Sequence, residues 1–401
     1  MKTTLNPTLL RWARERADLS AEQLAHKMGI KKSDRVLEWE KTGTLSVEQI
    51  ETLAQKTHTP FGYLFLSEPP HEEIPIKDFR RGKANKPPVP KPDLLDIIYH
   101  AIRCQSWYRD YLIDAREEPL AFAGSTQSPD SKQIVATANS IRQTLGITTE
   151  SVRDVQNWRD AYTAYKNASE RAGIIIMESG QVGSNTHRVL DPTDFKGFAL
   201  SDKYAPLVFI NAKDFVASKT FTLAHELAHI WIGDSGLSNL ETSFPEVSDQ
   251  SENFCNAVAA EFLVPSDSFL RAWNTQAQLS SEIARLTQVF KVSSLVIARK
   301  ALDAKLISRD EFFKYYEDQI ALFAKHRAEQ KAKQENREKK GGPSYYKQKE
   351  IQIGSRLSLA LVQSAQSGKT LIRDAMRLLY ISSTASFDAF AGKLFAEPDA
   401  E

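Results

Sequence analysis

The segment Phe221-Thr-Leu-Ala-His225-Glu226-Leu-Ala-His229-Ile-Trp231 contains the pattern H-E-x-x-H. Because its two histidines are four residues apart, a helix places both imidazoles on one face, where they can share a metal ion. Glu226 points near the same face. Two neutral imidazoles and a carboxylate suit Zn²⁺, with a fourth position left open for water. Such an ion lowers the pKa of its bound water to about 7, and Glu226 would remove the proton.

The residues around this motif favour a metal site over the alternative, a helix with two buried histidines and no ion. Chance produces the motif in roughly one chain in a hundred of this length. However, the preceding segment 205–211, Ala-Pro-Leu-Val-Phe-Ile-Asn, is typical of a short strand. Thr220 or Thr222 is expected to cap the helix that follows.

A third protein ligand is expected from the helix predicted at 251–265. Its apolar residues recur at helical spacing, and Pro265 ends it. Its acidic residues are Glu252 and Glu261, and no histidine follows before His326. A glutamate is therefore favoured over a third histidine, as in the thermolysin class of zinc sites. The residues alone do not decide whether Glu252 or Glu261 is the third metal ligand.

Two spaced motifs carry a resemblance to a known family. L-A-H-E-L-A-H, followed by E-x-x-x-N-A-x-A-A-E-F-L-V-P, resembles the ImmA/IrrE metallopeptidases over roughly residues 165 to 270. The resemblance implies a zincin-like, gluzincin-type peptidase with Glu252 as the third zinc ligand. Asn256 and Glu261 would then support the site. Cys255 stands where the family usually has a small residue.

The resemblance also suggests where a substrate would bind. In zincins a substrate peptide pairs with an edge strand beside the zinc, so 205–211 is the candidate strand. An oxyanion stabiliser is needed opposite Glu226. Tyr204 and His187 are the candidates, and the sequence does not choose between them.

Residues 1–68 are predicted to form a five-helix domain. Ser20 and Ser46 are placed to cap helices, and Gly43 to end one. The pieces L-S-x-E-Q-L-A-x-x-M-G and V-L-E-W-E-K-x-G resemble the Cro/repressor (XRE-like) helix-turn-helix. That resemblance implies binding of double-stranded DNA through the second helix of the pair.

The expected DNA contacts lie at the start of that helix. They are Lys31, Lys32, Ser33 and Arg35. The acidic residues Asp34, Glu38 and Glu40 share the helix and oppose phosphate binding. A helical bundle that contacts protein instead of DNA is the alternative.

Composition limits the class of protein. The 401 residues carry a formal net charge of +1 and are 41% hydrophobic, which is ordinary for globular domains and argues against a globally basic nucleic-acid coat. The two cysteines form no C-x-x-C pair, as expected in a reducing cytoplasm. No apolar signal-peptide core and no membrane-length apolar run is present. We therefore expect a cytoplasmic protein without membrane contact.

The chain is predicted to be mainly α with a small β-sheet, an α+β protein. Strands are expected at 174–177, 195–201 and 205–211, and helices at about 130–145 and 151–171. The predicted divisions are a helix-turn-helix domain (1–68), a Pro-rich linker (69–92), a zincin-like domain (93–272), a helical extension (273–340) and a helical C-terminal domain (341–401).

The sequence thus favours a zinc-dependent endopeptidase fused to a DNA-binding-like domain. The resemblance implies a transcriptional repressor as its protein substrate, in stress response or in control of phages and mobile elements. One alternative is a helix-turn-helix regulator that uses the zinc fold for sensing or docking. Another is a toxin–antitoxin component.

Overall fold

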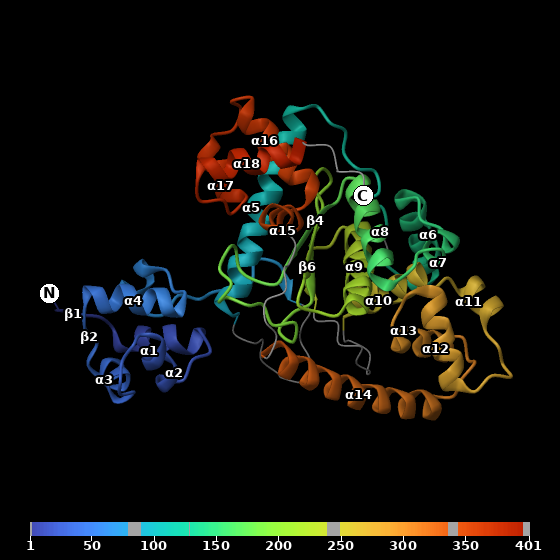
Figure 1. The fold of residues 1–401 in the computed structure, drawn as a ribbon, viewed down its shortest axis with the longest axis horizontal. Helices are drawn as coiled ribbons and strands as arrows, with labels where there is room; N and C mark the ends of the chain where they lie inside the picture. Colours follow the sequence, from blue (N-terminus) through green and yellow to red (C-terminus); the bar gives the residue numbers. More distant parts are fainter. Residues whose placement is uncertain (1, 79–89, 128, 239–248, 336–343, 396–401) are drawn as a thin grey trace. The chain divides into compact units, whose positions relative to one another are not determined.

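The computed structural model describes residues 2–78, 90–127, 129–238, 249–335 and 344–395 (Figure 1). Its contacts divide the described residues into two compact units. The first comprises residues 2–76, 90–100 and 185–188, and the second comprises the remainder. Helix α5 (Pro92–Asp114) contributes to both.

Before α5, the described part of the first unit contains four α-helices, a 3-10 helix and a two-stranded antiparallel sheet. Leucines, isoleucine, valine and Trp39 form its buried core. The fifth helix of the prediction is therefore a 3-10 helix, and the sheet of three-residue strands was not predicted. The bounds are β1 Lys2–Thr4, α1 Pro7–Arg16, α2 Ala21–Lys27, α3 Asp34–Thr42, β2 Thr44–Ser46, α4 Val47–Thr57 and η1 Phe61–Phe65.

The predicted helix ends in this unit are confirmed. Ser20 and Ser46 each cap a helix and form capping boxes with Gln23 and Gln49. Gly43 ends α3 in the left-handed conformation, and a Cβ there would lie 2.1 Å from the backbone oxygen of Leu5. Glycine is thus required where α3 turns into β2.

The second unit contains a five-stranded mixed sheet in the order β3-β7-β5-β6-β4. Its strands are short: β3 Lys77–Asp78, β4 Ile175–Ser179, β5 Gly197–Leu200, β6 Leu207–Asn211 and β7 Gly236–Ser238. Strands β4 and β6 are parallel, as are β3 and β7, whereas β5 is antiparallel to β6 and β7. A small sheet in a mainly helical chain confirms the α+β prediction.

The prediction that 205–211 forms an edge strand was wrong. Strand β6 pairs with β4 on one side and with β5 on the other, so its backbone groups face neighbouring strands on both sides. The sheet edges are β3 and β4. Strand β3 lies in the predicted linker and β7 in a predicted loop, and both are too short to show a period of two.

Helices surround this sheet. The segment expected as one helix at 151–171 is two, because the Asn157 side chain caps a new helix by accepting from the N–H groups of Arg159 and Asp160. The bounds are η2 Ser131–Gln133, α6 Ile134–Leu145, α7 Thr149–Arg153, α8 Trp158–Arg171, α9 Val216–Ile232, α10 Gln250–Leu263, α11 Ser266–Ala272, α12 Leu279–Phe290, α13 Ser294–Asp303, α14 Arg309–Glu335, α15 Tyr345–Ile353, α16 Ser355–Gln366, α17 Ile372–Leu378 and α18 Thr384–Phe395.

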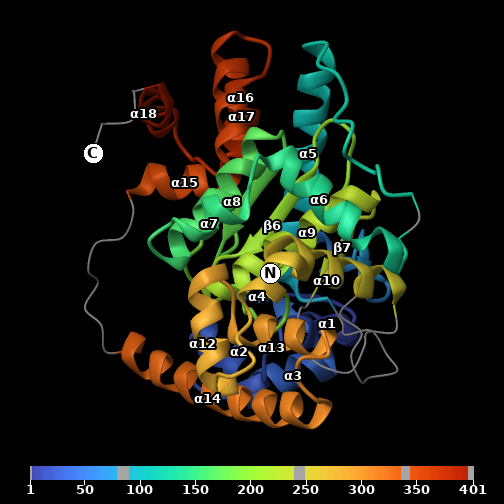
Figure 2. The same cartoon turned by 90° about the vertical axis from the view of Figure 1, so that its right-hand side faces the viewer.

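The core of the second unit is layered around α9. Helix α9 packs on β5 and β6, α10 packs on α9, and α6 packs on α10 (Figure 2). The buried side chains of this core include Val208 and Ile210 from β6 and Leu223, Leu227 and Trp231 from α9. Among the described helices, none has a stretch long and apolar enough to cross a bilayer.

Helices α15 and α16 cover the β4 edge of the sheet. Gly354, between them, has φ +91°, and a Cβ there would lie 3.0 Å from the backbone oxygen of Ile176. Gln352 Nε2 donates to the backbone oxygen of Gly183 at 2.7 Å. The C-terminal helices are therefore built onto the sheet.

Lys349 on α15 is 3% exposed. Its Nζ donates to Ser184 Oγ at 2.8 Å and to Gln352 Oε1 at 3.0 Å, and lies 5.5 Å from the centre of the Tyr380 ring. Burial lowers the pKa of Lys349 from 10.5 to about 8.

Because the unfolded chain keeps the ordinary lysine pKa, the unfolded state binds the extra proton between about pH 8 and 10.5. The free energy of unfolding should therefore rise with pH in this window, by up to about 2 kcal/mol between pH 8 and 9.5. Urea denaturation of Lys349→Met should lose this rise. Lys347→Met, a change at an exposed lysine of the same helix, should keep it; equal slopes in all three proteins would contradict the assignment.

Candidate metal centre

Helix α9 carries the H-E-x-x-H motif. It begins at Val216, after the N-cap residue Phe215, and ends at Gly233 in the left-handed conformation. The predicted caps were therefore wrong. Thr220 and Thr222 lie inside the helix, where their hydroxyls donate to backbone oxygens one turn earlier.

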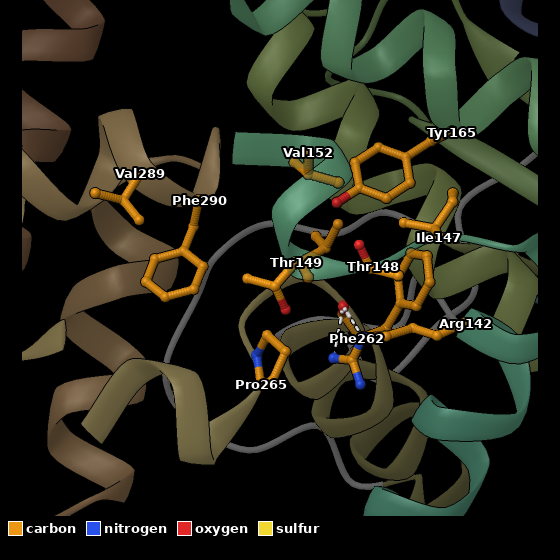
Figure 3. A pocket seen from close by; sticks show the side chains of 11 residues that line it. Arg142, Ile147, Thr148, Thr149, Val152, Tyr165, Phe262, Pro265, Val289 and Phe290 are labelled. Carbon is orange, nitrogen blue, oxygen red and sulfur yellow. Dashed lines mark hydrogen bonds between the residues drawn. The ribbon is translucent and has the colours of Figure 1, made fainter. Parts of the chain in front are cut away.

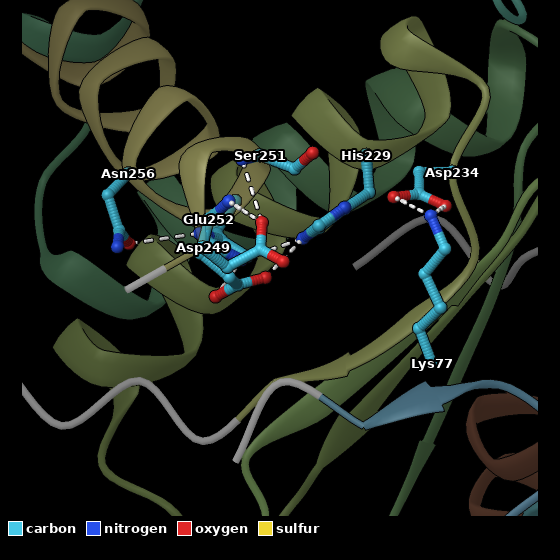
Figure 4. Close-up of polar contacts among 8 residues, drawn as sticks. Lys77, His229, Asp234, Asp249, Ser251, Glu252 and Asn256 are labelled. Atoms are coloured by element: carbon cyan, nitrogen blue, oxygen red, sulfur yellow. Dashed lines mark hydrogen bonds and ion pairs between the residues drawn. The ribbon is translucent and has the colours of Figure 1, made fainter. Parts of the chain in front are cut away.

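Three side chains from two helices meet at one point. His225 and His229 come from α9 and Glu252 from α10, and all three are buried (Figure 4). The two Nε2 atoms lie 3.0 Å apart. Glu252 Oε1 lies 2.9 Å from His229 Nε2, and Glu252 Oε2 lies 3.5 Å from His225 Nε2.

The start of α10 holds Glu252 in place. Asp249 is the N-cap, and its Oδ1 accepts from the N–H groups of Ser251 at 2.8 Å and Glu252 at 3.3 Å. Burial by itself would raise the pKa of Glu252, but the neighbouring His225 and His229 outweigh it and lower that pKa to about 2. The Glu252 carboxylate is thus anionic at neutral pH, which is the form that binds a metal.

Asn256, one turn further along α10, orients the first histidine. His225 Nδ1 lies 3.0 Å from Asn256 Oδ1. A hydrogen on Nδ1 donates to this oxygen, which leaves the Nε2 lone pair directed at the cluster. Burial lowers the pKa of His229, which favours its neutral form. Both rings are then ready to bind a metal.

The chemistry of these donors fits zinc. Bonds of 2.0–2.2 Å from a tetrahedral ion would separate neighbouring ligand atoms by about 3.4 Å. The three described donor atoms lie within 4.8 Å of one another, and their closest approaches are near that separation. Two imidazoles and one carboxylate leave a fourth position for water or substrate.

Glu261 lies in a different environment. Its carboxylate accepts from the N–H of Ser266 at 3.0 Å and from the Ser266 hydroxyl at 2.6 Å, and it pairs with Lys300 of α13. The structure therefore brings Glu252, and not Glu261, to the histidine pair. Glu261 joins the end of α10 to α11 and α13.

Glu226 faces the sheet through a close contact at Gly197 of β5. A Cβ on Gly197 would lie 2.7 Å from both Phe209 O and Thr222 Cγ2, and 3.5 Å from Glu226 Oε1. Only glycine lets α9 approach β5 this closely. Gly197 thereby sets the position of Glu226 relative to the sheet.

We expect Gly197→Ala to lower the free energy of unfolding by about 1–3 kcal/mol, because overpacking forces α9 and β5 apart. Adding Thr222→Ser removes the Cγ2 contact and should recover part of this loss, whereas the clash with the Phe209 oxygen remains. Calorimetric unfolding of the single and double variants measures both effects. A fully stable Gly197→Ala would contradict the close approach.

Among the described contacts, none joins either oxyanion candidate, Tyr204 or His187, to this cluster. Tyr204 lies in the turn between β5 and β6, where its N–H donates to Asp202 Oδ1 at 2.8 Å. His187 belongs to the first unit. Their role at the site stays a prediction.

A separate small pocket lies beside the other end of α10 (Figure 3). Residues from the α6–α7 connection, α8, α10 and α12 line it, among them Thr148, Tyr165, Phe262 and Phe290. Arg142 also lines it and donates to the Phe262 backbone oxygen at 2.8 Å. None of its lining residues belongs to the metal cluster.

Comparison with protein families supports the resemblance over the centre of the chain. Residues 169–302 match the family Peptidase M78, the IrrE N-terminal-like domain. This segment contains all three donor side chains and Glu226. Residues 353–393 match a domain of unknown function. A search of curated proteins found no match.

Proposed function

We propose that this protein is a cytoplasmic zinc-dependent endopeptidase that cleaves a protein, namely a transcriptional repressor. The observation that carries the proposal is the meeting of His225, His229 and Glu252 beside Glu226, within the segment that matches the peptidase family. The repressor as substrate follows from the resemblance to ImmA/IrrE peptidases. The two cysteines, Cys104 and Cys255, are buried and form no C-x-x-C pair, which fits a reducing compartment.

Each residue has a distinct part in this proposal. A bound zinc would supply Lewis acidity toward the scissile carbonyl and would acidify a water molecule. Glu226 accepts the proton of the attacking water and returns it to the leaving amine. Asn256 holds the His225 ring in orientation, and the Asp249 cap holds Glu252.

We expect Glu226→Gln to keep stoichiometric zinc and to lose cleavage by roughly 10²–10⁴-fold, because the amide cannot accept the proton. His225→Ala should lose both zinc and cleavage. Elemental analysis and a gel-based cleavage assay measure the two properties separately.

Glu261→Gln is the matched control, because Glu261 is a buried carboxylate of α10 that pairs with Lys300 and Ser266. It should keep zinc binding, whereas Glu252→Gln should weaken it. Retained cleavage by Glu226→Gln would remove Glu226 from the mechanism. Unchanged zinc in His225→Ala would remove His225 from the ligand set.

The substrate is tested with repressors encoded beside the gene, incubated with the purified protein with and without a chelator. Zinc-dependent cleavage at one site supports the endopeptidase. No cleavage of any of them, by protein that holds stoichiometric zinc, counts against a repressor substrate.

The alternative function is DNA-binding regulation through the first unit. Its support is the pair of helices α2 and α3, with Lys31, Lys32 and Arg35 exposed where α3 begins. Glu40, which opposed this role in the sequence, is buried and paired with Arg14 at 2.6 Å, so its charge is neutralised. Salt-sensitive operator binding without cleavage would favour a regulator over a peptidase.

We expect Lys31→Ala/Lys32→Ala to weaken DNA binding and to lower the slope of log K against log salt by about two, because two phosphate contacts are lost. Lys56→Ala, a change at an exposed lysine on α4, is the control and should keep the slope. Fluorescence anisotropy with a labelled operator measures it. An unchanged slope in the double variant would exclude these contacts.

A further inference from the structure

One edge of the sheet is formed by β3, a two-residue strand from the predicted linker. Strand β3 pairs in parallel with β7, with Lys77 opposite Gly236 and Asp78 opposite Leu237. The other side of β7 pairs with β5. Without β3, β7 would be the edge strand of the sheet, with backbone groups available to another strand.

This edge adjoins the residues of the proposed peptidase site. Ser238 of β7 pairs with Gly197, and Gly197 is the residue against which Glu226 packs. Strand β7 also follows α9 closely, since the N–H of Asp234 donates to His229 O at 3.1 Å. Only β7 therefore separates a strand bound along its outer side from Gly197, which lies against Glu226.

A salt bridge holds β3 at this place. Lys77 Nζ lies 2.7 Å from Asp234 Oδ1 and 2.9 Å from Oδ2 (Figure 4). The Lys77 side chain is 65% exposed and that of Asp234 is 18% exposed. Exposed ion pairs and two-residue strands contribute little free energy, so β3 is held weakly enough to be displaced.

We propose that β7 is the docking strand for an extended substrate segment and that β3 occupies it, so that the chain inhibits its own peptidase site. A substrate must then displace Lys77–Asp78 before it pairs with β7. Only the fraction of molecules with β3 released binds substrate, so the apparent KM rises while kcat stays the same. This inference rests on the proposed peptidase function.

The test compares full-length Lys77→Glu, which repels Asp234, with Lys77→Arg, which keeps the ion pair. Cleavage of a repressor substrate is measured over a range of concentrations. Lys77→Glu should raise kcat/KM about threefold to fivefold through a lower KM, since an exposed ion pair is lost. Lys77→Arg should match the wild type. Lys132→Glu, the same charge change at an exposed lysine of η2, should also have no effect.

Hydrogen–deuterium exchange provides a readout that needs no activity. Residues 236–238 should exchange faster in Lys77→Glu than in Lys77→Arg, because β3 no longer protects β7. Unchanged exchange would overturn the docking of β3. Faster exchange with unchanged kcat/KM would overturn the inhibition alone. Zinc-loaded protein that cleaves nothing in any variant would overturn the peptidase function and the inhibition with it.

Discussion

The packing of α10 on α9 is the constraint on which the candidate site depends, because it brings a carboxylate to two imidazoles on a neighbouring helix. Each end of α10 is anchored independently. Asp249 caps its beginning beside Glu252, and Glu261 joins its end to Lys300. On the other face of α9, the bare backbone of Gly197 sets the distance to the sheet. The three candidate metal ligands are thus placed by helix packing rather than by loops.

Much of this arrangement could be predicted from local pattern. The i, i+4 histidines require a helix for their chemistry, and α9 supplies it. The capped helices of the first unit follow from Ser20 and Ser46. The choice between Glu252 and Glu261 was harder, because both lie on one helix. Spacing alone did not decide which glutamate is near the histidines. The packing of α10 shows that Glu261 instead pairs with Lys300.

What escaped prediction depends on partners distant in sequence. Strands β3 and β7 have too few residues to show alternation, and they are defined by pairing across the sheet, β3 with β7 and β7 with β5. The interior position of β6 was missed for a related reason, since its fully buried residues would look the same at an edge. Gly197 carried no signal, because its importance lies in Thr222 and Phe209 across the core.

The cover that α15 and α16 provide for β4 has a consequence for fragments of this protein. The segment that matches the peptidase family ends at residue 302, before those helices begin. A recombinant piece that ends at this residue would leave the outer backbone groups of β4, whose residues are all buried in the full chain, facing water. Strand edges with unpaired backbone groups promote association between molecules. The smallest well-behaved soluble form of the peptidase domain should therefore retain the C-terminal helices.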